Sequence, residues 1–275
     1  MDKGLFEQLA DLAESFARIG IKPVICGGLG IYLCFQESEG QGREMIRATS
    51  DVDLMLTESQ VLEEAKRQAI AEIITAELKY VVREGREHLH FEKDNGRYLD
   101  ILAPRIKGFD TQNFRIKFVK SKLHGHITDE ACFIEEDLRT VSLRQLLPED
   151  ERSSGLHVQV PSPTNALILK LFAFDDRYEK QDRDRSQAHA WDVYVVTMLT
   201  GRSDYLEGRE FLSRHRDSAV ILKTRSIVDS KFSSVDKPGW QRVLETSGFH
   251  PGMSVQQKRE RLDEAKRRLV RWFAI

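Results

Sequence analysis

The stretch Thr49-Ser50-Asp51-Val52-Asp53-Leu54 decides the fold of this 275-residue chain. It follows the pair Gly27-Gly28, and a third acidic residue, Asp100, stands within Tyr98-Leu99-Asp100-Ile101-Leu102. Both acidic segments otherwise have the apolar character of strands. Carboxylates are rare inside strands unless something neutralises them, and a divalent metal ion is a common partner for several carboxylates. The sequence therefore predicts a metal site on a sheet.

The strand phase of these acidic residues supports that prediction. Residues two apart in a strand point to the same face, so Asp51 and Asp53 lie together while Val52 faces the core. If the strand that carries Asp100 lies alongside, the three carboxylates converge, and their repulsion calls for a cation. Magnesium prefers oxygen ligands and often binds substrate phosphates as well. We therefore expect Asp51, Asp53 and Asp100 to hold Mg²⁺, as a single ion or as a two-ion site.

The glycine pair predicts a phosphate site. Gly27-Gly28 stands between an expected short strand, residues 22–26, and helical residues 29–35. Glycine lets backbone N–H groups come close to a phosphate, and the N-terminus of a following helix favours negative charge. A glycine turn before an acidic strand is typical of nucleotide chemistry that depends on a metal.

The remaining pattern predicts an α+β protein. In the first half we expect a helix over 5–19, a second helix over 58–78, and strands at 51–56, 88–93, 97–102, 114–119 and 131–134. Asn95-Gly96 is a strong signal for a two-residue hairpin turn. The polar segment 148–155 is the expected boundary between domains 1–150 and 151–275. Beyond it Ser162-Pro163 begins a helical half, so a mixed sheet with flanking helices is followed by a C-terminal helical bundle.

Composition narrows the class of protein. Hydrophobic residues make up 40% and charged residues 31% of the chain, which is ordinary for a globular protein. The net charge of −2 excludes a global basic field. Three cysteines, an N-terminus unlike a signal peptide and the lack of an apolar run near the ~20 residues of a membrane span predict a cytoplasmic protein without membrane contact.

These motifs resemble the nucleotidyltransferase superfamily related to DNA polymerase β. The resemblance rests on Gly27-Gly28, on residues 49–54 and on Leu99-Asp100-Ile101-Leu102. Within that superfamily the chain is most similar to the AbiEii-like branch, which includes toxins of bacterial toxin–antitoxin systems. Two segments of the second half carry this similarity, Lys170-Leu171-x-Ala173-x-x-x-Arg177 and His189-Ala190-Trp191-Asp192-Val193-Tyr194. The likeness covers roughly residues 20–200.

The resemblance implies roles for particular residues on a nucleotidyltransferase-type sheet. Asp51, Asp53 and Asp100 would be catalytic and would bind the metal, and Asp100 could also accept the proton of the attacking group. The residues implied to bind the nucleotide are Gly27, Gly28, Lys170 and Arg177. Supporting positions are Thr49, Ser50 and Asp192.

The implied activity is magnesium-dependent transfer of a nucleotide from an NTP to an acceptor hydroxyl, in tRNA or in a protein. A toxin role and a cognate antitoxin follow from the resemblance. Two alternatives stay open: a catalytically silent nucleotide- or partner-binding protein on the same scaffold, and an antibiotic-modifying nucleotidyltransferase. The first is motivated by residues 29–50, which separate the glycine pair from the acidic pair by more than the usual ten or so positions. The excess lies in the polar stretch 36–47, expected to be a loop.

Other chemistry-bearing residues have plainer interpretations. Lys170 and Arg177 also suit a solvated helix face, and Asp192 also suits a salt bridge to an arginine of the same turn. His88-Leu89-His90 and His124-Gly125-His126 could each bind zinc, although neither has a further ligand at the usual spacing, which favours structural histidines. The run 258–271 alternates charges and predicts a packed amphipathic helix, with an RNA-binding surface as the second interpretation.

Overall fold

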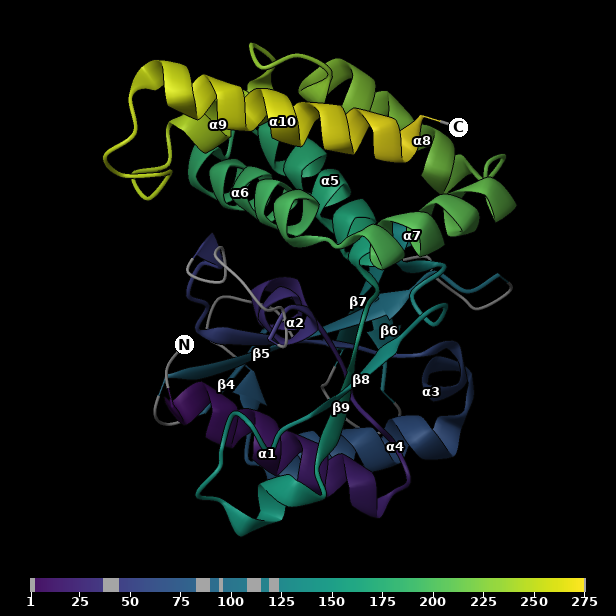
Figure 1. The fold of residues 1–275 in the computed structure, drawn as a ribbon. Helices are drawn as coiled ribbons and strands as arrows, with labels where there is room; N and C mark the ends of the chain where they lie inside the picture. The colour runs from purple at the N-terminus through teal and green to yellow at the C-terminus, as the bar shows by residue number, and fades with distance from the viewer. Residues whose placement is uncertain are drawn as a thin grey trace. The chain divides into compact units, whose positions relative to one another are not determined.

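The computed structural model describes residues 3–36, 45–82, 90–93, 96–107, 115–118 and 124–274. Its contacts divide the chain into two compact units. The first, the sheet unit, is Met1–Cys34 with Ala48–Ser162, and the second, the helical unit, is Phe35–Arg47 with Pro163–Ile275. Figure 1 shows the sheet and its helices in purple to teal and the helical unit in green to yellow. The α+β class with a C-terminal helical bundle is therefore confirmed.

The sheet unit contains one mixed sheet, with nine strands in the described residues, in the order β3-β4-β5-β2-β1-β9-β8 and with β6 and β7 beside the far end of β5. The strands are β1 (Val24–Cys26), β2 (Asp51–Met55), β3 (Val81–Val82), β4 (His90–Lys93), β5 (Arg97–Pro104), β6 (Arg115–Lys117), β7 (His124–Thr128), β8 (Arg139–Ser142) and β9 (His157–Val160). Its helices are α1 (Lys3–Arg18), α2 (Gly27–Cys34), α3 (Glu58–Leu62) and α4 (Glu64–Glu72).

The central strands place the acidic residues. β2 lies between β1, to which it is antiparallel, and β5, to which it is parallel. β4 and β5 form the antiparallel hairpin expected on either side of Asn95-Gly96, but the predicted two-residue turn is wrong, because Lys93 lies opposite Arg97 and three residues separate this pair in the sequence. Because Asp53 lies opposite Asp100 in the parallel register, both side chains leave the same face of the sheet.

Alternation along β2 fixes which face is buried. Val52 and Leu54 are fully buried in the core, whereas Asp51 and Asp53 keep partial exposure. The apolar stripe of α1, which includes Leu9 and Phe16, belongs to this core. Figure 1 shows α1 and α4 along the same side of the sheet. Burial of the apolar face thus forces the acidic side chains onto the opposite face.

Several expected elements differ from the structure. The predicted strand 131–134 is wrong: a 3-10 turn covers Asp129–Ala131 after β7. Ala131 and Ile134 are buried, but they lie one helical turn apart, so their apolar character came from a turn and not from a strand. The predicted helix 58–78 is interrupted at Glu63, whose extended backbone ends α3, and it finishes in a π-helical turn, Ile73–Glu77.

The division between the units lies beyond the boundary that the sequence predicts. β9 follows the polar segment 148–155, yet it pairs with β1 and β8 and so belongs to the sheet. The contacts change from one unit to the other between Ser162 and Pro163. That each unit is an independently folding domain stays a prediction.

The helical unit packs around aromatic side chains. Its helices are α5 (Pro163–Glu179), α6 (Arg183–Leu199), α7 (Arg202–Arg214), α8 (Ala219–Ile227), α9 (Pro238–Leu244) and α10 (Val255–Phe273). The rings of Trp191 and Tyr194 on α6 meet Phe249 edge to face, and the ring of Phe232 meets both Phe174 and Trp240. Such pairs supply both burial and a preferred geometry.

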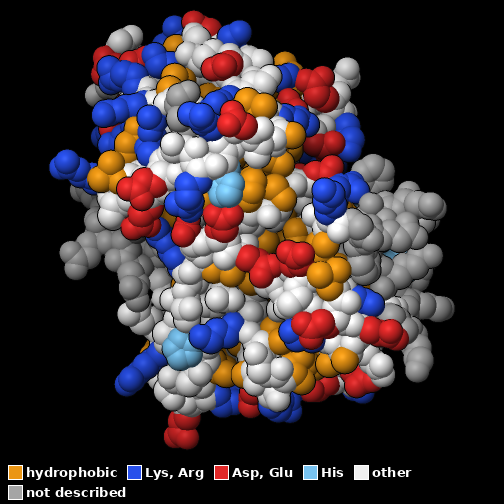
Figure 2. All heavy atoms as spheres, turned by 90° about the vertical axis from the view of Figure 1, so that its right-hand side faces the viewer, with side chains coloured by type: hydrophobic (Ala, Val, Ile, Leu, Met, Phe, Trp, Pro, Cys, Tyr) orange, Lys and Arg blue, Asp and Glu red, His pale blue; other side chains and the backbone are white. Residues whose placement is uncertain are grey.

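Helix α10 has the predicted amphipathic character, because Leu262, Ala265, Leu269 and Phe273 are all buried. Its outer charges are largely paired within the helix, for example Lys266 with Asp263 and Arg268 with Glu264. Figure 2 shows blue and red side chains interleaved on the drawn face. In the parts of the chain that the structure describes, no helix combines the length and apolar character needed to cross a membrane.

Candidate active site

The three predicted metal ligands lie together on the sheet. Asp51 and Asp53 come from β2 and Asp100 from β5. Each offers one carboxylate oxygen, and these three oxygens lie within 4.8 Å of one another. All three residues are partly exposed, so a ligand can approach them from solvent. Strand alternation and the parallel register are sufficient to produce this convergence.

A row of side chains crosses four strands at this point. Cys26 of β1 lies opposite Asp53, which lies opposite Asp100, which lies opposite His90 of β4. The Nδ1 atom of His90 is 2.5 Å from Oδ1 of Asp100. The sequence did not mark His90 as a site residue: a two-residue Asn95-Gly96 turn would place Phe91 opposite Asp100, and the observed register differs from that by one residue.

Gly27 meets the acidic pair directly. Its backbone has φ +65°, and a Cβ atom built on it would lie 1.6 Å from Oδ2 of Asp53. A side chain at this position would therefore displace the Asp53 carboxylate and strain the backbone. Gly28 follows in the first turn of α2, where it is buried. The glycine pair thus brings the start of a helix against a carboxylate of the acidic cluster.

The supporting positions of the motif behave differently from each other. The hydroxyl of Thr49 donates a hydrogen bond to Oδ1 of Asp51. Ser50, the next residue, has an exposed side chain. Thr49 therefore orients one of the proposed metal ligands, in the manner that hydrogen bonds commonly orient carboxylate ligands.

The donor set fits a hard divalent cation. The three convergent atoms are carboxylate oxygens, the ligand type that Mg²⁺ prefers. Because the three residues are partly exposed, a metal ion held by them could also bind ligands from solvent or substrate. Hydrogen bonds also orient this set, from Thr49 to Asp51 and between His90 and Asp100. Mg²⁺ itself remains part of the proposal below.

Within the helical unit, a second charged group surrounds Asp192. Lys170 Nζ of α5 is 2.7 Å from Oδ2 of Asp192, and both residues are buried. Arg47 contributes two hydrogen bonds to the same carboxylate, at 2.9 and 3.2 Å. Burial alone would raise the pKa of Asp192, but Lys170 and Arg47 outweigh burial and hold that pKa below its ordinary value. The partners of Asp192 thus come from α5 and from the segment before β2, not from its own turn.

His189 and Arg177 belong to the same group of residues. Burial, with a further contribution from Lys170, lowers the pKa of His189 to about 3, so its imidazole is neutral near pH 7. The Nδ1 atom of His189 is buried and has no hydrogen-bond partner among the described residues. Arg177 is close enough to His189 to lower its pKa as well. In the sequence His189 stood within a motif but had no assigned role, and Arg47 was not marked.

The structure therefore brings the predicted site residues together in two groups. The sheet unit assembles Gly27, Asp51, Asp53 and Asp100, with Gly28 and Thr49 beside them. The helical unit assembles Lys170, Arg177 and Asp192 with Arg47. Asp51 follows Arg47 by four residues in the chain, so one short segment carries a member of each group. Of the histidine pairs, His88 and Leu89 lie outside the described residues.

Comparison with known protein families identifies the family of this chain. A search of curated proteins and a search of solved structures found no significant similarity. The family described as nucleotidyl transferase AbiEii toxin, type IV toxin–antitoxin system, matches residues 9–266. That range contains both groups of predicted site residues and spans most of the chain. The chain is therefore a nucleotidyltransferase that belongs to the AbiEii toxin family of type IV toxin–antitoxin systems.

Proposed function

We propose that this protein transfers a nucleotide from an NTP to a hydroxyl group of tRNA or of a protein, in a magnesium-dependent reaction. The convergence of Asp51, Asp53 and Asp100 within 4.8 Å is the observation that carries the proposal. Family membership supports nucleotidyl transfer as the reaction class. A reaction that consumes NTP is expected in the cytoplasm, and the toxin–antitoxin family implies a cognate antitoxin.

The chain's own residues would divide the work as follows. Asp51, Asp53 and Asp100 would hold the metal, and a bound metal would supply stabilisation of the charge that develops on the phosphate oxygens. Asp100 lies at the edge of the cluster next to His90 and could accept the proton of the attacking hydroxyl. The acceptor oxygen attacks the α-phosphorus, the bond to the β-phosphate breaks, and pyrophosphate leaves. Gly27 and Gly28 offer backbone N–H groups to the triphosphate.

Lys170 and Arg177 would contribute positive charge to phosphate binding. Lys170 is held by Asp192 and is buried, so its ammonium group is fixed in place rather than mobile. Arg47, on the same carboxylate, adds a second cation with a planar fork suited to phosphate. We propose that Asp192 serves as an anchor for these cations and does not itself contact substrate.

The test determines which phosphorus atom of the NTP is transferred. NTPs labelled at the α- or at the γ-phosphorus are incubated with the protein, Mg²⁺ and either total tRNA or total protein. We expect the α-label to appear on one class of macromolecule, with release of pyrophosphate and no transfer of the γ-label. Transfer should disappear in the isosteric double variant Asp51→Asn, Asp53→Asn, and it should persist in Glu149→Gln, an exposed carboxylate of the same unit.

Three outcomes would count against the proposal. Equal incorporation by wild type and the double variant would remove the acidic cluster from the chemistry. Transfer of the γ-label would indicate a kinase. Labelling of an added aminoglycoside, with none on tRNA or protein, would favour the antibiotic-modifying alternative.

A further inference from the structure

The helical unit contains a pocket of about 630 Å³ that has no assigned role. It is lined from three segments: the start of α6, the residues just before β2, and the turn between α9 and α10. Its lining residues are Met45, Arg47, Asp184, Gln187, Ala188, Trp191, Thr246, Gly248, His250, Pro251 and Met253. A volume of this size lies within the usual range for small-molecule sites, roughly 300–1,000 Å³.

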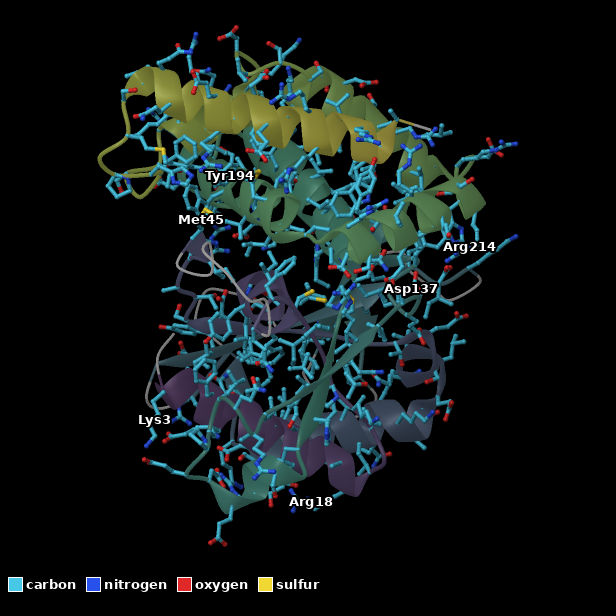
Figure 3. All side chains as sticks on the ribbon, viewed as in Figure 1. Lys3, Arg18, Met45, Asp137, Tyr194 and Arg214 are labelled. Atoms are coloured by element: carbon cyan, nitrogen blue, oxygen red, sulfur yellow. The ribbon has the colours of Figure 1, made fainter. Side chains whose placement is uncertain are left out.

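Hydrogen bonds tie the three segments around the pocket. Trp191 Nε1 donates to the carbonyl of Met45 at 2.7 Å, and Gln187 Nε2 donates to the hydroxyl of Thr246 at 3.3 Å. The hydroxyl of Tyr194, one turn further along α6, is 2.7 Å from Nε2 of His250. Figure 3 shows the labelled Met45 and Tyr194 near each other at this end of the helical unit. The pocket walls are therefore fixed by specific contacts.

The backbone of His250 adds an independent observation. Its φ is +42°, a conformation that residues other than glycine seldom adopt. The ring is held by Tyr194 and packs against Phe249. Such strain is retained only where the surroundings enforce it, and it is frequent at ligand-binding positions. A strained histidine in the wall of the pocket points to a site that binds something.

The chemistry of the lining fits a nucleoside. His250 and the small exposed part of the mostly buried Trp191 supply aromatic surface, and Met45, Pro251 and Met253 add apolar contacts, which suits the face of a planar base. The polar groups of Asp184, Gln187 and Thr246 suit the edge of the base, which carries hydrogen-bond donors and acceptors.

One charged residue joins the pocket to the cations of the helical unit. Arg47 lines the pocket, and it shares the Asp192 carboxylate with Lys170. The helical unit therefore offers apolar and aromatic pocket walls next to a cation, Arg47, which matches a ligand with an apolar planar end and an anionic end.

We propose that this pocket receives the base and sugar of the nucleotide substrate, with the phosphate end toward Arg47. The inference rests on the proposed nucleotidyl transfer and adds to it the place that selects the base. Because the pocket belongs wholly to the helical unit, that unit would bind the nucleoside part of the substrate by itself.

A photo-crosslinking experiment on the wild-type protein tests the location. The affinity of each of the four NTPs is measured first by isothermal titration calorimetry. An azido or thio analogue of the tightest-binding NTP is then crosslinked, and the labelled peptides are identified by mass spectrometry. We expect the label in 184–191 or 245–253 and competition by the unmodified NTP. Label confined to other peptides would overturn the assignment.

A variant that fills the pocket gives a second measurement. Ala188→Phe places a ring in the pocket without removing a polar group, and Ala219→Phe adds the same bulk at an exposed position of α8. We expect at least tenfold weaker NTP binding for Ala188→Phe and unchanged binding for Ala219→Phe, with Mn²⁺ affinity at the acidic cluster retained in both.

Failure of this inference can be told apart from failure of the proposed function. A wild-type protein that binds no NTP and transfers no label would contradict the proposed function. A wild-type protein that binds NTP as tightly as Ala188→Phe does would contradict the pocket assignment alone. Should Ala188→Phe fail to fold, the crosslinking of the wild-type protein decides the matter.

Discussion

At Gly27 a single added carbon would reach the acidic cluster directly. A Cβ atom there would overlap Oδ2 of Asp53, and φ +65° adds backbone strain. We predict that Gly27→Ala abolishes detectable transfer and lowers the free energy of unfolding by about 2–4 kcal/mol, combining strain and displacement.

Gly20→Ala is the matched control for this variant. Gly20 has φ +71° with open space around it among the described residues, so it carries the strain without the clash. Transfer assays and thermal unfolding of both variants separate the two effects. Equal loss of activity in both variants would show that contact with Asp53 does not matter.

His90 is predicted to position Asp100. Its Nδ1 is 2.5 Å from Oδ1 of Asp100, which leaves the other carboxylate oxygen for the metal. Removal of such a hydrogen bond typically costs a metal site about 10–100-fold in affinity. We therefore expect His90→Ala to weaken Mn²⁺ binding, measured by electron paramagnetic resonance, by at least tenfold.

Rescue distinguishes positioning from a general loss of structure. Asn places an N–H donor near the position of Nδ1, so His90→Asn should recover most of the Mn²⁺ affinity. His157→Ala, an exposed histidine on β9 of the same sheet, should bind Mn²⁺ like the wild type. If His90→Ala also binds like the wild type, His90 does not position the ligand.

Individual residues differed in how far the sequence could predict them. Asp51, Asp53 and Asp100 could be predicted as a group, because strand alternation places Asp51 and Asp53 on one face and a neighbouring strand can add Asp100 to that face. His90 was not predicted, because the register of the hairpin differs by one residue from that of a two-residue Asn95-Gly96 turn. Arg47 was not, because its partner Asp192 lies 145 residues further along the chain, and no local pattern reports such a contact.

At the scale of elements, the pairing of α5 with α6 depends on a buried carboxylate. Asp192 on α6 binds Lys170 on α5 and also Arg47. Removing one partner of a buried pair leaves an uncompensated charge and commonly costs about 3–5 kcal/mol. We predict that Asp192→Ala destabilises the protein by that amount in denaturant unfolding.

Two further variants calibrate this loss. Lys170→Met removes one cation but leaves Asp192 paired with Arg47, so its cost should be clearly smaller than that of Asp192→Ala. Asp182→Ala removes the N-cap of the same helix and should cost about 1 kcal/mol. Similar losses in all three would mean that Asp192 acts only through its own helix.

The elements that the sequence predicts well share strong local signals. Helix α1, strand β2 and the β4–β5 hairpin are of this kind, because each has clear periodicity or a defined turn. Strands β8 and β9 were missed, since each is four residues long and β9, the partner of β8, pairs in turn with β1, which is distant in sequence. Their partners, and not their composition, make them strands.

For the whole molecule, His189 predicts acid sensitivity. Its pKa in the folded protein is about 3, against an ordinary value of 6.5, because of burial and of the nearby cations Lys170, Arg47 and Arg177, with Asp192 opposing them. Between pH 6.5 and 3 the unfolded chain binds a proton here that the folded protein does not. Stability should therefore fall as pH decreases below 6.5.

The expected loss of stability can be measured against a variant with an uncharged side chain at position 189. From pH 7 to pH 5, His189 should lower the free energy of unfolding by up to about 2 kcal/mol. His189→Gln cannot bind that proton, so its stability should fall less over the same interval. Parallel pH dependences of the two proteins, from urea unfolding at each pH, would exclude His189 as the source.

The division of the chain into units has a consequence for its synthesis. The segment Phe35–Arg47 belongs to the helical unit, although the rest of that unit begins at Pro163. A ribosome therefore releases Arg47 long before the carboxylate that neutralises it, 145 residues later. The contact between Arg47 and Asp192 can therefore form only after α6 has been synthesised, when most of the polypeptide has been made.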